Sequence, residues 1–168
     1  MQRFFSQYNF FGKIKTGFTL IELLIVIGIT IALLSASIPI YGSLQVKAQL
    51  SETSSQLVQS LRSARENSIG RFNNSAHGVF LNLTSSPNSY TIYQGNSFVT
   101  RNIDYDRLYS LDNAVTIQNI SLTTSSSNID INFSSGLGKP NNVGSFRLVH
   151  SVTGAYTISI SSLGKIEE

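Results

Sequence analysis

The sequence predicts an α+β protein in which a long N-terminal helix packs on a C-terminal domain of antiparallel β-sheet. Three observations support this fold class. An almost continuous apolar run extends over residues 18–42. Residues 43–70 then repeat apolar side chains at helical spacing, and residues 71–168 hold short alternating runs separated by turn residues. A helix laid against one face of a sheet would bury both apolar surfaces.

The composition points to a membrane-associated chain without cysteine chemistry. The 168 residues include no Cys, which excludes disulfides, thiolate catalysis and lipid-modified cysteine. Arg3, Lys13 and Lys15 all precede Gly17. When these three of the twelve basic residues are left out, the remaining nine equal the nine acidic residues in number. The excess positive charge therefore flanks the apolar run and is a topology signal rather than a nucleic-acid footprint.

The apolar run is long enough to cross a bilayer. As a helix from Phe18 to Tyr41 it would rise about 36 Å at ~1.5 Å per residue, against a hydrocarbon core of roughly 30 Å. We expect residues 1–17 to be a leader on the cytoplasmic side, residues 18–42 to be the membrane segment, and the remaining chain to lie outside the inner membrane. Glu22 interrupts the run, and a carboxylate inside a membrane segment usually marks a function.

Gly17 stands at the border between polar, basic sequence and the apolar run. Because glycine is a poor helix residue, the chain there suits a protease that grips an extended segment. Cleavage after Gly17 would leave the free amine of Phe18 one helical turn from Glu22. The two opposite charges would neutralise each other, either within one chain or between neighbouring chains.

Residues 17–29, with the sequence GFTLIELLIVIGI, resemble the prepilin signature of type IV pilins and of the pseudopilins of type II secretion. Pro39 also falls where those families place a helix-kinking proline. The resemblance implies a pilin-like fold, cleavage between Gly17 and Phe18 by a prepilin peptidase, and N-methylation of Phe18. It further implies that Glu22 pairs with a neighbouring subunit's amine while an inner-membrane assembly platform builds a helical filament.

Two other interpretations of the N-terminus stay open. Ser35-Ala36-Ser37 is a small-residue cluster of the kind that signal peptidase cleaves. The apolar run before it is longer than the usual 7–15 residues and contains Glu22, which disfavours a secretory signal peptide. The third interpretation is an ordinary signal-anchored membrane protein that forms no filament.

The helix is expected to continue from Phe18 to about residue 68, with Pro39 as a kink because proline removes a backbone hydrogen bond. Beyond the membrane segment one helical face carries the apolar stripe. We expect this stripe to pack on the protein's own domain and the helix to end near Gly70. The stripe consists of Leu50, Leu57, Leu61, Ala64 and Ser68.

The C-terminal part is predicted to form short antiparallel strands, because apolar residues alternate there with period two. Residues 104–106 are interpreted as a solvated turn rather than a calcium loop, since the Gly and later Glu of such a loop are missing. The predicted strand regions are centred on residues 79–83, 90–93, 98–100, 115–122, 129–133, 146–152 and 156–160.

A second resemblance concerns the helix end. Residues 57–69, with Ala64-Arg65, are similar to the helix end of the minor pseudopilins of the FimT/GspH type, and residues 158–165 are similar to that family's final strand and turn. The resemblance implies a minor subunit at or near the filament tip that primes assembly or contacts cargo or DNA. Type IV pilus, type II secretion and competence machines are not separated by these residues.

Enzymatic motifs are absent from the sequence, so we expect no catalytic residues, no cofactor and no metal. His77 and His150 have no cysteine beside them and no metal-ligand spacing. A DNA-binding tip pilin is the alternative function, although the basic residues of the chain after Gly17 are scattered in sequence. Those considered are Arg62, Arg65, Arg71, Arg101, Arg107, Lys139, Arg147 and Lys165, eight of the nine basic residues after Gly17.

Overall fold

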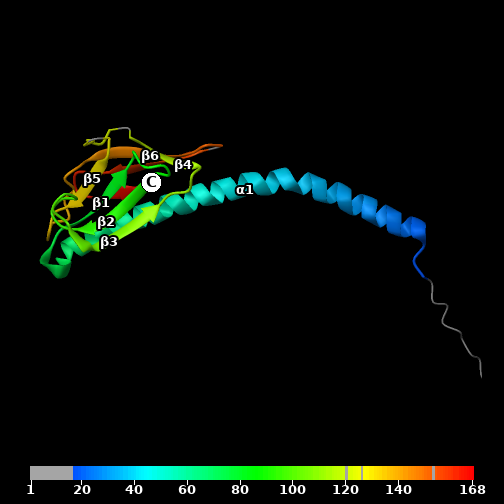
Figure 1. Ribbon diagram of the computed structural model, residues 1–168, viewed down its shortest axis with the longest axis horizontal. Coiled ribbons are helices and arrows are strands. Elements are labelled where there is room, and N and C mark those ends of the chain that lie inside the picture. Colours follow the sequence, from blue (N-terminus) through cyan, green and yellow to red (C-terminus); the bar gives the residue numbers. More distant parts are fainter. Residues whose placement is uncertain (1–16, 120, 126, 153) are drawn as a thin grey trace, which may run out of the picture. The chain divides into compact units, whose positions relative to one another are not determined.

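The computed structural model describes residues 17–119, 121–125, 127–152 and 154–168, and for residues 36–41 and 43 it describes the backbone alone. Residues 1–16 of the predicted leader lie outside this set. The described chain is α+β, with one α-helix, one short 3₁₀-helix and two antiparallel sheets (Figure 1). The elements are α1 (Leu20–Ile69), η1 (Phe72–Asn74), β1 (His77–Asn82), β2 (Ser89–Gln94), β3 (Asn102–Ser110), β4 (Val115–Asn119), β5 (Ile129–Phe133), β6 (Gly144–His150), β7 (Ala155–Ile160) and β8 (Ile166–Glu167).

The chain divides into two compact units with the boundary between Tyr41 and Gly42, inside α1. The first unit contains the N-terminal part of α1. Its backbone stays helical through Pro39, whose side chain lies outside the described set, so the predicted kink remains a prediction. Within the described ranges, no helix combines the length and the apolar character that a membrane span requires.

The second unit, residues 42–168, contains the C-terminal part of α1 and both sheets. The first sheet has the strand order β3-β2-β1-β5 and the second has the order β4-β6-β7-β8, with every neighbouring pair antiparallel. In the first sheet His77 pairs with Gln94 and Ile92 pairs with Arg107. The strand order makes β3 an edge strand of the first sheet.

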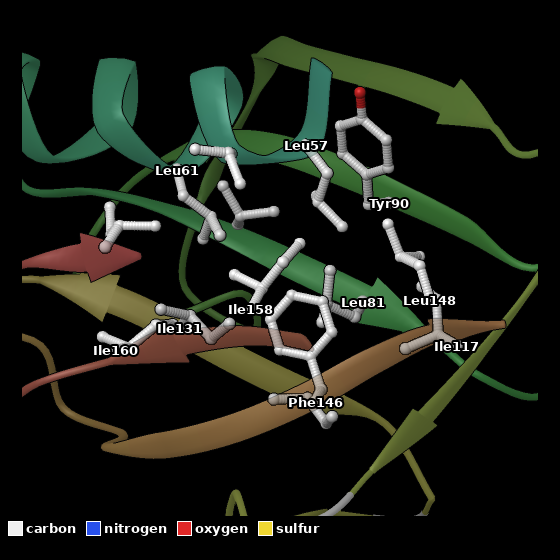
Figure 2. Packing of buried hydrophobic residues seen from close by; sticks show 14 of the residues in the cluster. Leu57, Leu61, Leu81, Tyr90, Ile117, Ile131, Phe146, Leu148, Ile158 and Ile160 are labelled. Atoms are coloured by element: carbon white, nitrogen blue, oxygen red, sulfur yellow. The ribbon is translucent and has the colours of Figure 1, made fainter. Parts of the chain in front are cut away.

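The core lies between α1 and the two sheets. The predicted stripe of α1 is confirmed, because each of its five side chains is buried, and Ser54 and Val58 are buried with it. Figure 2 shows Leu57 and Leu61 pointing from the helix into side chains of both sheets, among them Ile131 and Phe146. The period of 3.6 seen in the sequence therefore places these residues against the sheets.

Two predicted loop and strand assignments were wrong. Residues 98–100, predicted as a strand, form a turn, and residues 104–106, predicted as a turn, lie inside β3. The second error arose because Asp104 and Asp106 were taken to mark a solvated turn, whereas both belong to a strand that is exposed along nearly its whole length. Its strand geometry comes from backbone pairing with β2, which composition does not reveal.

Asp130 holds the turn between β2 and β3. The Tyr93 hydroxyl donates to Asp130 Oδ1 at 2.5 Å, and the Phe98 backbone N–H donates to Oδ2 at 3.2 Å. Burial, followed by the contact with Asp130, raises the pKa of Tyr93 far above its usual value. The Phe98 ring stacks on Phe80 at 3.7 Å, with the Arg101 guanidinium 3.7 Å above it. These contacts replace the strand hydrogen bonds that the sequence had led us to expect.

Candidate functional site

The predicted cleavage site lies in an open, non-helical stretch. Gly17 and Phe18 precede the first residue of α1, and the Phe18 side chain is 81 % exposed. A Cβ built on Gly17 would have no atom within 4 Å among the described residues. The Gly17–Phe18 bond therefore lies outside the helix, and the Phe18 side chain is accessible among the described residues.

Glu22 occupies the first turn of α1, where Thr19 caps the helix. Thr19 Oγ1 accepts the backbone N–H of Glu22 at 3.3 Å, and the Thr19 carbonyl accepts the N–H of Leu23 at 3.2 Å. Thr-x-x-Glu is the capping-box spacing, and a carboxylate there is favoured by the helix dipole. The sequence reasoning missed this second role of Glu22, although the spacing was present. In the described part of the chain, Glu22 makes no ion pair.

The apolar side chains of the first unit are exposed. They stand on all sides of the helix rather than along one stripe, as the run of exposed positions from Leu20 to Ser35 shows. Such a helix is suited to an apolar environment that surrounds it, whether lipid or other helices. The exposed residues are Phe18, Leu20, Ile21, Leu23, Leu24, Ile25, Val26, Ile27, Ile29, Ile31, Leu33 and Leu34.

Two hydroxyl groups in this segment bond within the helix. Thr30 Oγ1 donates to the Val26 carbonyl at 2.6 Å, and Ser35 Oγ donates to the Ala32 carbonyl at 2.9 Å. A hydroxyl that bonds to a carbonyl of the preceding turn needs no water. The segment can therefore be buried in lipid or protein without leaving these two donors unsatisfied.

Three of the scattered basic residues gather at one place. Arg62, Arg65 and Lys165 line a hollow of about 310 Å³ together with Glu66. Arg65 donates from Nη2 to the Leu163 carbonyl at 3.3 Å, while its buried Nε has no hydrogen-bond partner in the described chain. Lys165 forms an ion pair with Glu167, so the local charge is only partly positive.

The two aspartates of β3 differ in their surroundings. Asp106 accepts from Arg101 Nε at 2.7 Å in an ion pair, and Asp104 is exposed. Among the residues that the structure describes, no three His, Cys, Asp or Glu side chains come together as metal ligands.

A groove between α1 and β3, lined by both polar and apolar side chains, is the feature that sequence reasoning missed most completely. We call it the α1–β3 groove. Its helix wall is a stripe of uncharged side chains at helical spacing, a signal that the sequence did contain. Its strand wall could not be predicted without knowing that β3 pairs with β2. The helix wall consists of Ser55, Gln56, Gln59, Ser60, Ser63 and Asn67, and the strand wall of Tyr105, Arg107 and Tyr109.

Comparison of the chain with protein-family models, with curated proteins and with solved structures finds no match.

Proposed function

We propose that this chain is a structural subunit of a helical filament of the type IV pilus or type II secretion pseudopilus kind. The observation that carries the proposal is the segment from Gly17 to Ile29, which resembles a prepilin signature, at the start of a helix with apolar side chains on all sides. The further likeness of residues 57–69 to FimT/GspH pseudopilins makes it a minor subunit.

The subunit waits in the inner membrane, with its N-terminus in the cytoplasm and its β domain in the periplasm. Residues 18–42 form the membrane anchor. On assembly this segment exchanges lipid for the helices of neighbouring subunits, so that little apolar surface meets water. The C-terminal part of α1 is already buried in its own domain, which leaves the N-terminal part for the filament core.

Phe18 and Glu22 are the residues that carry out the chemistry of assembly. A prepilin peptidase cleaves the Gly17–Phe18 bond, and the new amine of Phe18 is methylated. In the filament core that ammonium group pairs with the Glu22 carboxylate of a neighbouring subunit. An uncompensated charge in an apolar core costs several kcal/mol, so only a subunit placed with the two charges in register docks stably.

The test is the intact mass and the N-terminal peptide of the protein isolated from its native membranes. A chain that begins at Phe18 and carries one additional methyl group on its amine is the expected result. A chain that still begins at Met1 in cells with an active prepilin peptidase would make the protein an ordinary anchored protein. A start at Ile38 would identify a secreted domain and exclude filament assembly through this helix.

DNA binding at a filament tip is the second candidate function. It is favoured by the gathering of Arg62, Arg65 and Lys165 around one hollow and opposed by Glu66 at the same place. Phosphate contacts make binding strongly dependent on salt. Full-length protein in detergent that retards duplex DNA at low salt, with Arg62→Gln weakening the retardation and Arg147→Gln leaving it unchanged, is the expected result for this candidate. Absence of retardation at low salt would exclude it.

A further inference from the structure

The α1–β3 groove consists of two hollows that both have lining residues from α1 and β3. The smaller one also reaches η1, β1 and β2, through Phe72, His77, Ile92, Tyr93 and Gln94. The larger has a volume of about 540 Å³ and lies between Ser60 and Tyr109. The smaller, of about 90 Å³, lies one helical turn further on, between Ser63 and Arg107. Because Arg107 and Tyr109 are alternate residues of β3, they share one face of the strand. A ligand lying along this seam would therefore meet both cavities, of which the larger is wide open to solvent.

The helix wall offers uncharged hydrogen-bonding groups. All six of its side chains end in a hydroxyl or a carboxamide, and the spacing places them on one face of α1. Ser60 donates to the Gln56 carbonyl at 2.8 Å. In the described part of the chain, the side chains of Ser55, Gln59 and Ser63 make no hydrogen bond, so their donors and acceptors are available to a ligand.

The strand wall offers aromatic rings. Tyr105 is 49 % exposed and Tyr109 is 40 % exposed. The Tyr109 ring stacks on the buried ring of Tyr90, with centroids 5.0 Å apart and an angle of 13° between the planes. This stacking holds Tyr109 in position, so its exposed surface is a rigid apolar platform with polar groups around it.

One cation stands at the smaller cavity. Arg107 is the single side chain with a permanent charge in the lining of the two cavities, and it makes no ion pair within the described residues. His77 lines the same cavity with its side chain 5 % exposed and its buried Nδ1 without a partner in the described chain. A guanidinium group matches the geometry of a carboxylate, whereas one isolated cation is too few for a nucleic-acid backbone.

We propose that the α1–β3 groove binds an acidic saccharide. The sugar rings lie against Tyr105 and Tyr109, the ring hydroxyls bond to the helix wall, and the carboxylate binds Arg107. A peptide is the competing occupant, since Phe72, Ile92 and Tyr93 also line the smaller cavity, and the acidic hexapeptide in the experiment separates the two. The proposal concerns the outer domain alone and does not depend on filament assembly.

The experiment uses full-length protein in detergent and titrates it calorimetrically with trigalacturonate and with its methyl ester, which has the same sugar rings but no charge. The free acid is expected to bind about tenfold more tightly than the ester, as one charge-assisted hydrogen bond allows. Arg107→Gln should remove this preference. Arg147→Gln, the same change at an exposed position of β6, should leave it intact. Tyr109→Ala should weaken the binding of both the acid and the ester.

Four outcomes would overturn the proposal. The first is the absence of binding of either form, and the second is a preference for the acid that survives Arg107→Gln. The third is acetate competing as strongly as trigalacturonate, which would reduce the groove to a simple carboxylate site. The fourth is an acidic hexapeptide binding where trigalacturonate does not, which would assign the groove to a protein partner. Because Arg107 is exposed, its variant should retain the fold, and circular dichroism checks this.

Discussion

Thr19 Oγ1 accepts the backbone N–H of Glu22 at 3.3 Å, so Glu22 lies in the capped first turn of α1. The carboxylate therefore stands at the positive end of the helix dipole in addition to its proposed pairing with a neighbouring amine. Loss of Glu22 would change two interactions at once. The two roles can be separated, because the cap depends on the Thr19 hydroxyl and the intersubunit pair depends on the Glu22 charge.

Glu22→Gln should abolish most filament incorporation, whereas Thr19→Val should retain it. The glutamine keeps the backbone hydrogen bond to Thr19 but leaves a neighbour's ammonium unpaired, at a cost of about 3–5 kcal/mol in an apolar surrounding. Loss of a cap costs about 0.5–2 kcal/mol. Fractionation of sheared filaments, with cleavage at Gly17 measured in parallel, checks both variants. Equal losses in the two would mean that the cap, rather than the charge, controls assembly.

Leu61→Ala should destabilise the domain by about 2–5 kcal/mol, since the side chain is completely buried between α1 and the sheets. Leu163→Ala is the matched control, because that side chain is 73 % exposed and should change stability by no more than about 0.5 kcal/mol. Chemical unfolding of the full-length protein, followed by circular dichroism, gives both values. A change below about 1 kcal/mol at Leu61 would contradict the packing of α1 on the sheets.

Ser68→Ala should cost about 1–3 kcal/mol, although it removes a single hydroxyl group. Ser68 Oγ accepts the backbone N–H of His77 at 2.8 Å in a buried position and thereby joins the end of α1 to β1. Alanine would leave that N–H buried without a partner. Ser55→Ala, on the exposed face of the same helix, should be neutral or slightly stabilising because alanine is the better helix former. The two unfolding curves are compared under identical conditions.

Acidification below pH 6.5 should destabilise the domain through His77. Burial is the largest cause of its shift and lowers its pKa from the ordinary value of 6.5, while a backbone hydrogen bond with Ser75 opposes the shift. Above pH 6.5 the imidazole is neutral in both states. As the pH falls below 6.5 the unfolded chain binds a proton before the folded one, so stability is lost until the folded pKa is reached.

His77→Gln should flatten this dependence, and the comparison is made between unfolding midpoints in closely spaced buffers from neutral pH downward. The carboxylates titrate at lower pH and contribute to both proteins. A wild-type midpoint that does not fall more steeply than that of the variant just below pH 6.5 would contradict a lowered pKa for His77.

Local pattern predicted the helix stripe and most strands. Leu57 and Leu61 could be assigned to the core because a period of 3.6 on a helix, or of 2 on a strand, is repeated in the sequence wherever one face is buried. Residues 129–133 were predicted as a strand for the same reason, and β5 lies at that position. Gly17, Phe18 and Glu22 were likewise singled out by a contiguous segment of sequence, because the features that mark them are local.

The sequence by itself determined the α+β class, the buried stripe of α1 and the candidate processing segment. The tertiary structure decided where β3 pairs, that Phe98 packs in a turn beside Asp130, and that Tyr109 and Arg107 face the polar side of α1. The physical reason is that an exposed edge strand carries no burial pattern. Its position is set by hydrogen bonds to a strand distant in sequence, and the groove exists only once that pairing is made.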